Sequence, residues 1–450
     1  MKISNNRIKV TSMKALAEFF LYFSLVILSC LTAGCTSEVD IIGGTPETPE
    51  NPQANDPNRR SVVISLQNKL ILVNGTPESR AITRDGIAEE DENRIESFDI
   101  YAFGSDKEEG PYTFQEHFAY RSDAGTLPTG ASPIDLKADE AAGKINVVFY
   151  PRKGLFTKFY CVANQTEMND AAGNIYTNYT PLQQSSQTQS GVPGDIVTSP
   201  GTPTESDFIK LNTPLLNPTG FNANILLAPL PMSGANSQPT DLREYSMGTY
   251  VRLNVSLTRA VARFDIVNDA TKSHFTITDI SMGNGRQGVT LFPIRPTGDV
   301  PATNGQLITY PYRLFDGLNA NAGTTTKAFY CYPCKAIDAG FLILKGLYTM
   351  NLTDEKKEVS YRIPFERVTD GNGTRIEINH NHRYTVQITE ADPFELTANI
   401  RLVDWETGDY IDDYEPDNGL ETIAVADLLP VGETTYNIST CLLYTSDAAD

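Results

Sequence analysis

The sequence has few of the residues from which enzymes and metalloproteins build their sites. Its 450 residues include only four histidines, six cysteines and one tryptophan. No H-E-x-x-H or G-x-S-x-G pattern occurs, so neither a zinc protease nor the nucleophile of an α/β-hydrolase is indicated. We therefore expect a protein that is not an enzyme, with no catalytic residues, no metal and no cofactor.

The cysteines and histidines that are present form weak pairs. Cys331 and Cys334 have the spacing of a redox or zinc pair, but no second pair accompanies them. We expect them to be buried thiols or a local disulfide. His380 and His382 lie two positions apart and would share a face if both lay on a strand, yet no further ligand pattern supports a metal site. Six cysteines are also too few to form a disulfide framework in a chain of this length.

Basic residues are in deficit. The chain has 36 Lys and Arg against 56 Asp and Glu, which gives a formal net charge of −20. Such a surface repels nucleic acid and anionic lipid, so neither is an expected partner. It does suit a secreted or surface-displayed protein.

The longest apolar run is too short for a membrane span. It covers residues 19–31, follows four basic residues and ends just before Cys35, which makes residues 1–34 a secretory signal. The small residues before Cys35 resemble a bacterial lipoprotein signal, in which that cysteine is acylated with palmitate and becomes the N-terminus. Thr32 stands where that signal usually has Leu. Cys30 is a weaker alternative, and a plain secretory signal with an incidental cysteine is the other interpretation.

Helical periodicity is absent apart from a short patch at residues 137–142. Apolar residues alternate instead in many short segments separated by Gly, Pro, Asn and Asp, for example IESFDIYAF at residues 95–103. This pattern predicts an all-β protein. At this length we expect two successive β-sandwich domains.

Residues 250–268 contain a change of alternation. Apolar residues occupy odd positions up to Leu257 and even positions from Ala260, so the buried face changes side. A bulge would do this, as would a strand that leaves one core and enters the next. We interpret it as a domain junction. The predicted division is a disordered tether at 35–60, a first domain at 61–248 and a second at 249–418.

The C-terminal residues do not follow this pattern. Residues 419–440 read as the start of a further β-module. The last ten residues, 441–450, have the sequence CLLYTSDAAD and look like a translated sequencing adapter. We interpret them as an artefact and the native protein as truncated at this point.

Several short motifs, taken in order, resemble the fimbrillin family, the pilus-subunit lipoproteins of Bacteroidales bacteria. The matching segments are RIESFDIYAF at 94–103, FYCVAN at 159–164, PMSG at 231–234, LTRAVAR at 257–263, NHNHRYTV at 379–386 and VDW at 403–405. The resemblance implies transthyretin-like sandwiches and a structural subunit, either shaft or accessory and tip, of a fimbria that serves adhesion.

It also implies an assembly route. A lipid-anchored precursor at the cell outer membrane is cut by an Arg-specific protease after its first strand. A strand from another fimbrial subunit then fills the gap by β-strand complementation, and the fimbrium engages a host or bacterial surface receptor. Arg84 and Arg80 are the arginines placed for this cut, although they are also typical solvated loop residues.

The physical basis of this route is the segment at 62–73. If it forms a strand inside a sheet, its removal leaves an unpaired edge and an apolar slot, both costly in water. The alternative is a surface lipoprotein that binds glycan and never polymerises.

Overall fold

The structure is a computed structural model, and most of its elements are β-strands. It describes residues 51, 53–66, 71–72, 89–123, 126–139, 144–171, 174–177, 204–220, 223–243, 250–292, 303–317, 324–350, 355–369, 372–393, 395–404 and 436–441. All of them belong to one compact unit, Asn51–Asp450. The predicted all-β class is confirmed.

Helical segments in the described residues are single turns. They are η1 (Asp91–Asn93), α2 (Glu205–Phe208), α3 (Ala270–Ser273) and η2 (Ala336–Asp338). Among the residues that the structure describes, no helix is long and apolar enough to cross a membrane.

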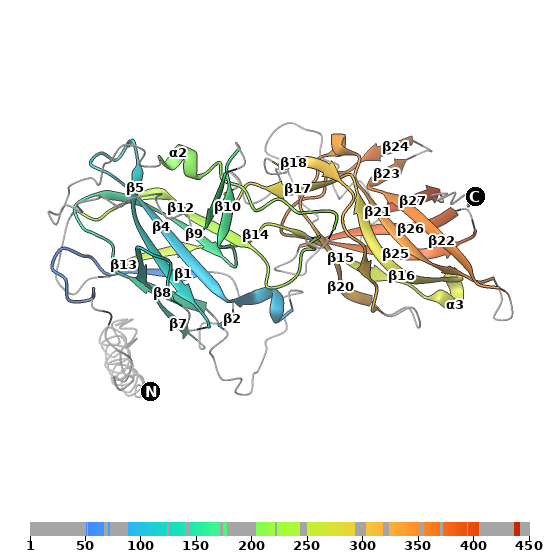
Figure 1. Cartoon of the computed structure of the whole chain (residues 1–450), viewed down its shortest axis with the longest axis horizontal. Helices are drawn as coiled ribbons and strands as arrows, with labels where there is room; N and C mark the ends of the chain where they lie inside the picture. Colours follow the sequence, from blue (N-terminus) through green and yellow to red (C-terminus); the bar gives the residue numbers. More distant parts are fainter. Residues whose placement is uncertain are drawn as a thin grey trace, which may run out of the picture. The chain divides into compact units, whose positions relative to one another are not determined.

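The first domain consists of two facing sheets (Figure 1). The four-stranded sheet has the order β13 (Val251–Val255), β1 (Val62–Leu66), β8 (Lys144–Phe149) and β7 (Asp135–Asp139). The six-stranded sheet has the order β14 (Thr258–Arg259), β12 (Met232–Asp241), β9 (Phe156–Ala163), β4 (Ser97–Ser105), β5 (Thr113–Arg121) and β6 (Ala131–Pro133). One core of aliphatic and aromatic side chains lies between the two sheets, so this domain is a sandwich.

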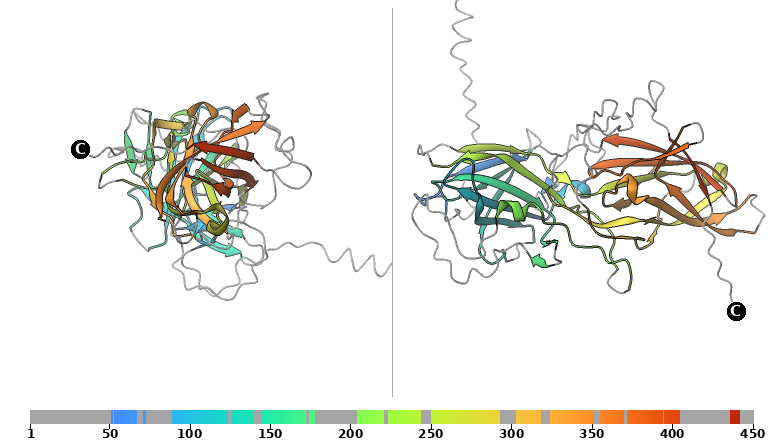
Figure 2. Two further views of the ribbon diagram at one scale, coloured as in Figure 1. Left: turned by 90° about the vertical axis from the view of Figure 1, so that its right-hand side faces the viewer. Right: turned by 90° about the horizontal axis from the view of Figure 1, so that it is seen from above.

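The second domain is a sandwich of the same kind. Its five-stranded sheet has the order β20 (Thr324–Cys331), β15 (Ala262–Val267), β25 (His382–Ala391), β26 (Glu395–Asp404) and β27 (Tyr436–Cys441). The facing sheet has the order β19 (Arg313–Leu314), β16 (Phe275–Gly283), β21 (Phe341–Tyr348) and β22 (Lys357–Pro364). Both sheets contribute to a second core. Figure 2 gives these strands from two further directions.

Four short strand pairs complete the fold. They are β2 (Ile71–Leu72) with β3 (Arg94–Ile95), β10 (Glu167–Asn169) with β11 (Ile175–Thr177), β17 (Gly285–Val289) with β18 (Thr303–Ile308), and β23 (Glu366–Thr369) with β24 (Asn372–Arg375).

The change of alternation at 250–268 coincides with the passage between the two cores. Strand β13 pairs with β1, and Val255 lies in the first core. Strand β15 pairs with β20 and β25, and Phe264 lies in the second core. The predicted boundary at 248/249 falls before β13, whereas the structure keeps β13 and β14 in the sheets of the first domain.

Two other segments differ from their expected roles. Residues 137–139, in the patch with helical periodicity, belong to strand β7. Residues 436–440, at the end of the expected further module, lie in β27, which pairs with β26 and so extends the sheet of the second domain. Cys441, the first residue of the adapter-like tail, ends this strand.

Candidate functional site

Strand β1 forms where the sequence reads VVISL, with apolar residues at Val62, Ile64 and Leu66. These three side chains are fully buried in the core of the first domain. Alternation places them on one face of the strand, while Val63 and Ser65 point to the opposite face. Strand β1 is therefore part of the core and not an appendage to it.

The neighbours of β1 come from distant parts of the chain. It runs antiparallel to β8, with Ile64 opposite Val147, and parallel to β13, with Ile64 opposite Leu253. Neither neighbour is joined to β1 by a hairpin, because β8 and β13 lie at least 78 residues further along the sequence, the distance from Leu66 to Lys144. Strand β1 occupies an inner position of the sheet without a tight turn to either side.

The segment before β1 is anchored to the first domain. Arg59 donates to Glu116 Oε1 at 2.6 Å and to the Tyr150 carbonyl at 2.7 Å. Glu116 is buried and also accepts from the Arg152 backbone N–H at 2.7 Å. Asn51 adds a hydrogen bond to the Pro133 carbonyl. Residues 51–60 therefore differ from the disordered tether predicted for 35–60, of which 35–50 lie outside the described residues.

The segment after β1 is described in part. Strand β2 pairs in parallel with β3, with Ile71 opposite Arg94. The predicted processing residues Arg80 and Arg84 lie within 73–88, outside the described residues, as does the predicted lipid-attachment residue Cys35. The description resumes at Glu89.

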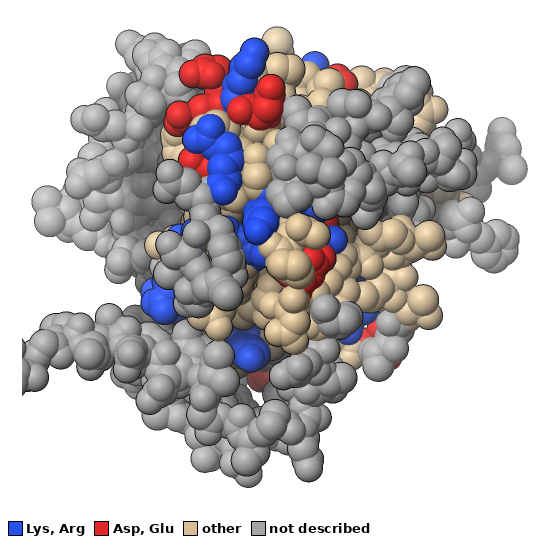
Figure 3. Space-filling view, turned by 90° about the vertical axis from the view of Figure 1, so that its left-hand side faces the viewer, with Lys and Arg blue, Asp and Glu red and all other residues tan. Residues whose placement is uncertain are grey.

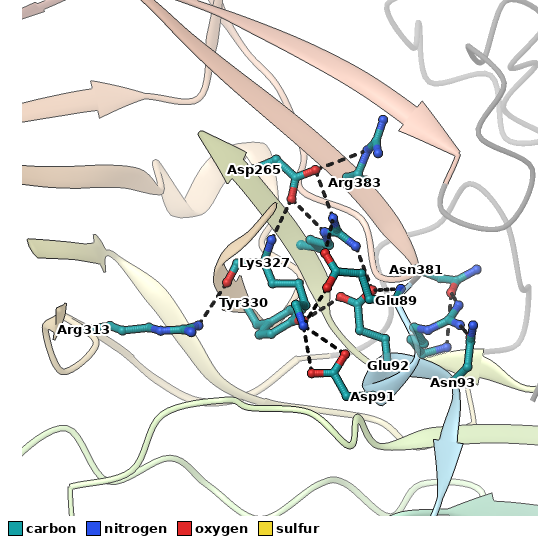
Figure 4. Close-up of polar contacts among 12 residues, drawn as sticks. Glu89, Asp91, Glu92, Asn93, Asp265, Arg313, Lys327, Tyr330, Asn381 and Arg383 are labelled. Carbon is teal, nitrogen blue, oxygen red and sulfur yellow. Dashed lines mark hydrogen bonds and ion pairs between the residues drawn. The ribbon is translucent and has the colours of Figure 1, made fainter. Parts of the chain in front are cut away.

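The residues after this gap are fixed by a buried ionic cluster (Figure 4). Arg263 of β15 donates from Nη1 to Glu92 Oε2 at 2.7 Å and from Nε to Asp265 Oδ1 at 2.7 Å. Tyr330 donates its hydroxyl to Glu92 Oε1 at 2.5 Å. The side chains of Arg263, Glu92 and Asp265 are at most 1% exposed. The turn η1 is thus joined to the second domain by charges that water does not reach.

The charge states of Arg263 and Tyr330 are set by burial and by the carboxylates next to them. Burial on its own would lower the pKa of Arg263, but Asp265 and Glu92 raise it above its usual value. Burial is the main cause that raises the pKa of Tyr330, and the carboxylate of Glu92 raises it further. Arg263 therefore stays charged and Tyr330 stays a hydroxyl donor at any physiological pH.

Further contacts surround the cluster. Lys327 Nζ lies 2.8 Å from Glu89 Oε2 and 2.9 Å from Asp91 Oδ2. Arg259, itself buried, donates to Asn93 Oδ1 at 2.5 Å and to Asn381 Oδ1 at 3.2 Å. Residues 89–93 are in this way held by side chains of β14, β15 and β20, and Arg259 of β14 is itself bound by Asn381 in the turn before β25.

This cluster was not predicted from the sequence. Arg263 and Asp265 occupy the odd positions of β15, which the alternation assigns to an outer face, yet both are buried. The sequence does contain an acidic stretch, EEDE at 89–92, and a charged segment, RFD at 263–265. Without the fold, nothing in the sequence brings these two segments together.

The cysteine and histidine pairs considered from the sequence do not form a site. Cys331 and Cys334 are buried free thiols, and burial raises the pKa of Cys334 to about 12. His380 lies in the turn before β25, so it does not share a strand with His382. Within the described ranges no group of three or more potential ligands could hold a metal ion.

Charge is mixed on one end face of the first domain. Figure 3 shows basic and acidic side chains next to one another on the described part of this face. Despite the net charge of −20, that part of the surface offers no patch of a single sign to a charged partner.

No protein-family model and no curated protein matches the sequence. Solved structures that are similar to the chain include fimbrial proteins. One is the tip fimbrial protein Mfa3 from Porphyromonas gingivalis with a C-terminal truncation, at 14% identity and a TM-score of 0.41, covering 77% of this chain and 100% of that one. Another is a fimbrial assembly protein from Parabacteroides distasonis, at 12% identity and a TM-score of 0.39, covering 76% and 95%. The fimbrial anchor protein Mfa2 from Porphyromonas gingivalis is similar at 10% identity and a TM-score of 0.31, covering 78% and 100%.

Proposed function

We propose that the chain is a subunit of a cell-surface fimbria and that it assembles by strand replacement. In this proposal a precursor is anchored in the outer membrane through Cys35. A cut at Arg84 or Arg80 then frees β1, and a strand of another subunit takes its place. The observation that carries the proposal is the inner position of β1 between β8 and β13.

The energetics of the slot support replacement over simple loss. Burial of one large aliphatic side chain contributes about 1.5–3 kcal/mol, so Val62, Ile64 and Leu66 together contribute about 5–9 kcal/mol. That is comparable to the whole stability of a typical domain, about 5–15 kcal/mol. An empty slot would also leave β8 and β13 unpaired on the sides that face it. Once cut, the domain therefore needs either its own strand or a substitute.

The anchors on both sides define what would be exchanged. The cluster around Arg263 holds residues 89–93, so a cut between 73 and 88 leaves β3 and β4 attached. Arg59 holds the other end through Glu116 and the Tyr150 carbonyl. The exchanged piece thus ends at the linker that contains Arg80 and Arg84.

Limited digestion of the purified chain with an Arg-specific protease tests this proposal. We expect a new N-terminus at Ala81 or Asp85, followed by ladders of oligomers that resist SDS and dissociate on boiling. The Arg80→Ala/Arg84→Ala variant is the matched control and should stay uncut and monomeric. An assembled form that still starts at Cys35 would contradict the cut, and a cut protein that persists as a monomer would favour the glycan-binding lipoprotein.

Lipid attachment is tested separately. Labelled palmitate should be incorporated into the wild-type precursor and not into Cys35→Ser, which should be released from the membrane fraction. Equal labelling of both would place the acylated residue elsewhere and would leave the strand-replacement part of the proposal untouched.

A further inference from the structure

The outer face of the four-stranded sheet carries two different rows of side chains across β1. In one row, Val63 lies opposite Val148 of β8 and Arg252 of β13. In the next, Ser65 lies opposite Asn146 and Asn254. The Ser65 hydroxyl donates to Asn146 Oδ1 at 2.7 Å.

The β1 and β8 part of these rows is largely buried although it lies outside the core, whereas Arg252 and Asn254 of β13 are exposed. Val63 and Val148 are each 9% exposed and Asn146 is 8% exposed. A strand that presents the wrong side chain to Asn146 therefore leaves a buried amide without its hydrogen bond, and water cannot readily replace it. A hydroxyl placed against Val148 would be poorly solvated for the same reason.

We infer that the row of Asn146, Ser65 and Asn254 selects which strand can replace β1 and in which register. This inference rests on the proposed strand replacement. The partner it selects is a strand of another subunit with the pattern aliphatic, aliphatic, aliphatic, small hydroxyl, aliphatic.

The polar row supplies information that the core face lacks. A slip by one residue turns Ile64 and Leu66 outward, so alternation alone rejects it. A slip by two residues still turns the same alternate residues of β1 towards the core, so alternation alone does not reject it. In one direction such a slip moves Ser65 from Asn146 to Val148, and in the other direction it puts Val63 against Asn146; the row of Asn146, Ser65 and Asn254 rejects both.

Peptide exchange into the nicked full-length protein tests the inference. The protein is cut in the 73–88 linker, at its own arginines or at a protease site inserted there, and is offered labelled peptides of residues 59–69. Four peptides are compared: wild type, Ser65→Thr, Ser65→Val, and the swapped Val63→Ser/Ser65→Val. The swapped peptide has nearly the same composition as the wild type and moves the hydroxyl by two residues.

We expect the wild-type and Ser65→Thr peptides to bind within about twofold of each other. Ser65→Val and the swapped peptide should bind more weakly than the wild type by a factor of about ten or more, because they leave Asn146 Oδ1 without the Ser65 hydroxyl. A second readout uses the Asn146→Val variant of the nicked protein that receives the peptide. This variant should erase most of the difference in affinity between the Ser65→Thr and Ser65→Val peptides.

The outcomes separate the two ideas. If the swapped peptide binds as well as the wild type, selection by the polar row is overturned while strand replacement stands. If no peptide binds, the wild type included, strand replacement is contradicted and the selection fails with it. The inference is supported if the wild-type protein binds the Ser65→Thr peptide more tightly than the Ser65→Val peptide and the Asn146→Val protein binds the two equally.

Discussion

Arg263 and Glu92 are separated by 171 positions in the sequence and form an ion pair of 2.7 Å in which both side chains are 0% exposed. Glu92 belongs to η1, at the start of the chain segment that leads into β4, and Arg263 belongs to β15 of the second domain. Loss of either partner of a pair buried to this extent is costly, because the buried charge that remains loses a counter-ion.

The first prediction concerns this pair. Glu92→Gln removes the negative charge but keeps the shape, so Arg263 loses one of its two closest buried counter-ions and keeps Asp265. We expect the free energy of unfolding to fall by about 3 kcal/mol, as for other buried pairs that lose one partner. Urea denaturation monitored by circular dichroism measures it.

The matched control for this prediction lies four residues away. Glu96 pairs with Arg94 at 2.8 Å, but both side chains are well exposed, at 44% and 38%. Glu96→Gln should change the stability by less than about 1 kcal/mol, because solvent screens exposed pairs. Equal effects of the two variants would contradict the structural role assigned to Glu92.

The second prediction concerns the anchor before β1. In protein cut within the 73–88 linker, Arg59→Ala should speed the release of the N-terminal segment about tenfold, because Glu116 stays buried without its counter-ion. Asp56→Ala is the control, because its contact to Arg59 is longer, at 3.5 Å, and Asp56 is 38% exposed. Size-exclusion chromatography of cut protein over time follows the release. No difference between the two variants would show that Arg59 does not retain the segment.

The third prediction concerns Gly234, in the PMSG motif of β12. A Cβ at this position would lie 2.3 Å from the Ser256 carbonyl oxygen, between β13 and β14. That oxygen belongs to the backbone and cannot rotate away, so we expect Gly234→Ala to destabilise the protein by about 2–3 kcal/mol. Differential scanning calorimetry measures the shift in Tm.

Gly130→Ala separates this steric effect from backbone strain. Gly130 has a φ of +81° but nothing lies within 4 Å of a Cβ there. Its replacement by Ala should lower the free energy of unfolding by only about 1–2 kcal/mol, the cost of a left-handed conformation for a residue with a Cβ. A larger loss at Gly130 than at Gly234 would contradict the close approach of β12 to residue 256.

The sequence predicts strands best where one face is apolar and the other polar. The alternation at Val62, Ile64 and Leu66 and the change of phase after Leu257 depend only on local periodicity, and both have clear counterparts in the structure. Strand β5 has no such pattern. Its residues Gln115, Glu116 and His117 are all buried.

The reason lies in contacts between distant residues. His117 pairs with Asp99 at 2.7 Å, and Glu116 pairs with Arg59 at 2.6 Å. Polar side chains can be buried in this way only when a partner meets them, and the partner is known only once the strands are paired. The same argument explains why η1 and Arg263 were not connected from the sequence, and why residues 51–60 looked like a free tether.

The last prediction concerns pH. His380 is 2% exposed, and burial lowers its pKa to about 4, with a smaller contribution from His382. The unfolded chain binds a proton at this residue near its usual pKa of about 6.5. Between these two values the unfolded state binds more protons than the native state, so stability is complete above about pH 6.5 and falls as the pH is lowered towards 4.

A pair of pH titrations isolates this contribution from the carboxylates that titrate nearby. Wild type should lose up to about 3 kcal/mol more than His380→Gln between pH 7 and pH 4, the free energy that corresponds to a depression of this size. Between pH 7 and pH 8 the two curves should run parallel, since His380 is neutral in both states there. Urea midpoints measured at half-unit intervals give both curves. If they run parallel down to pH 4 as well, then His380 takes up its proton in the native state, and the buried position of this imidazole is wrong.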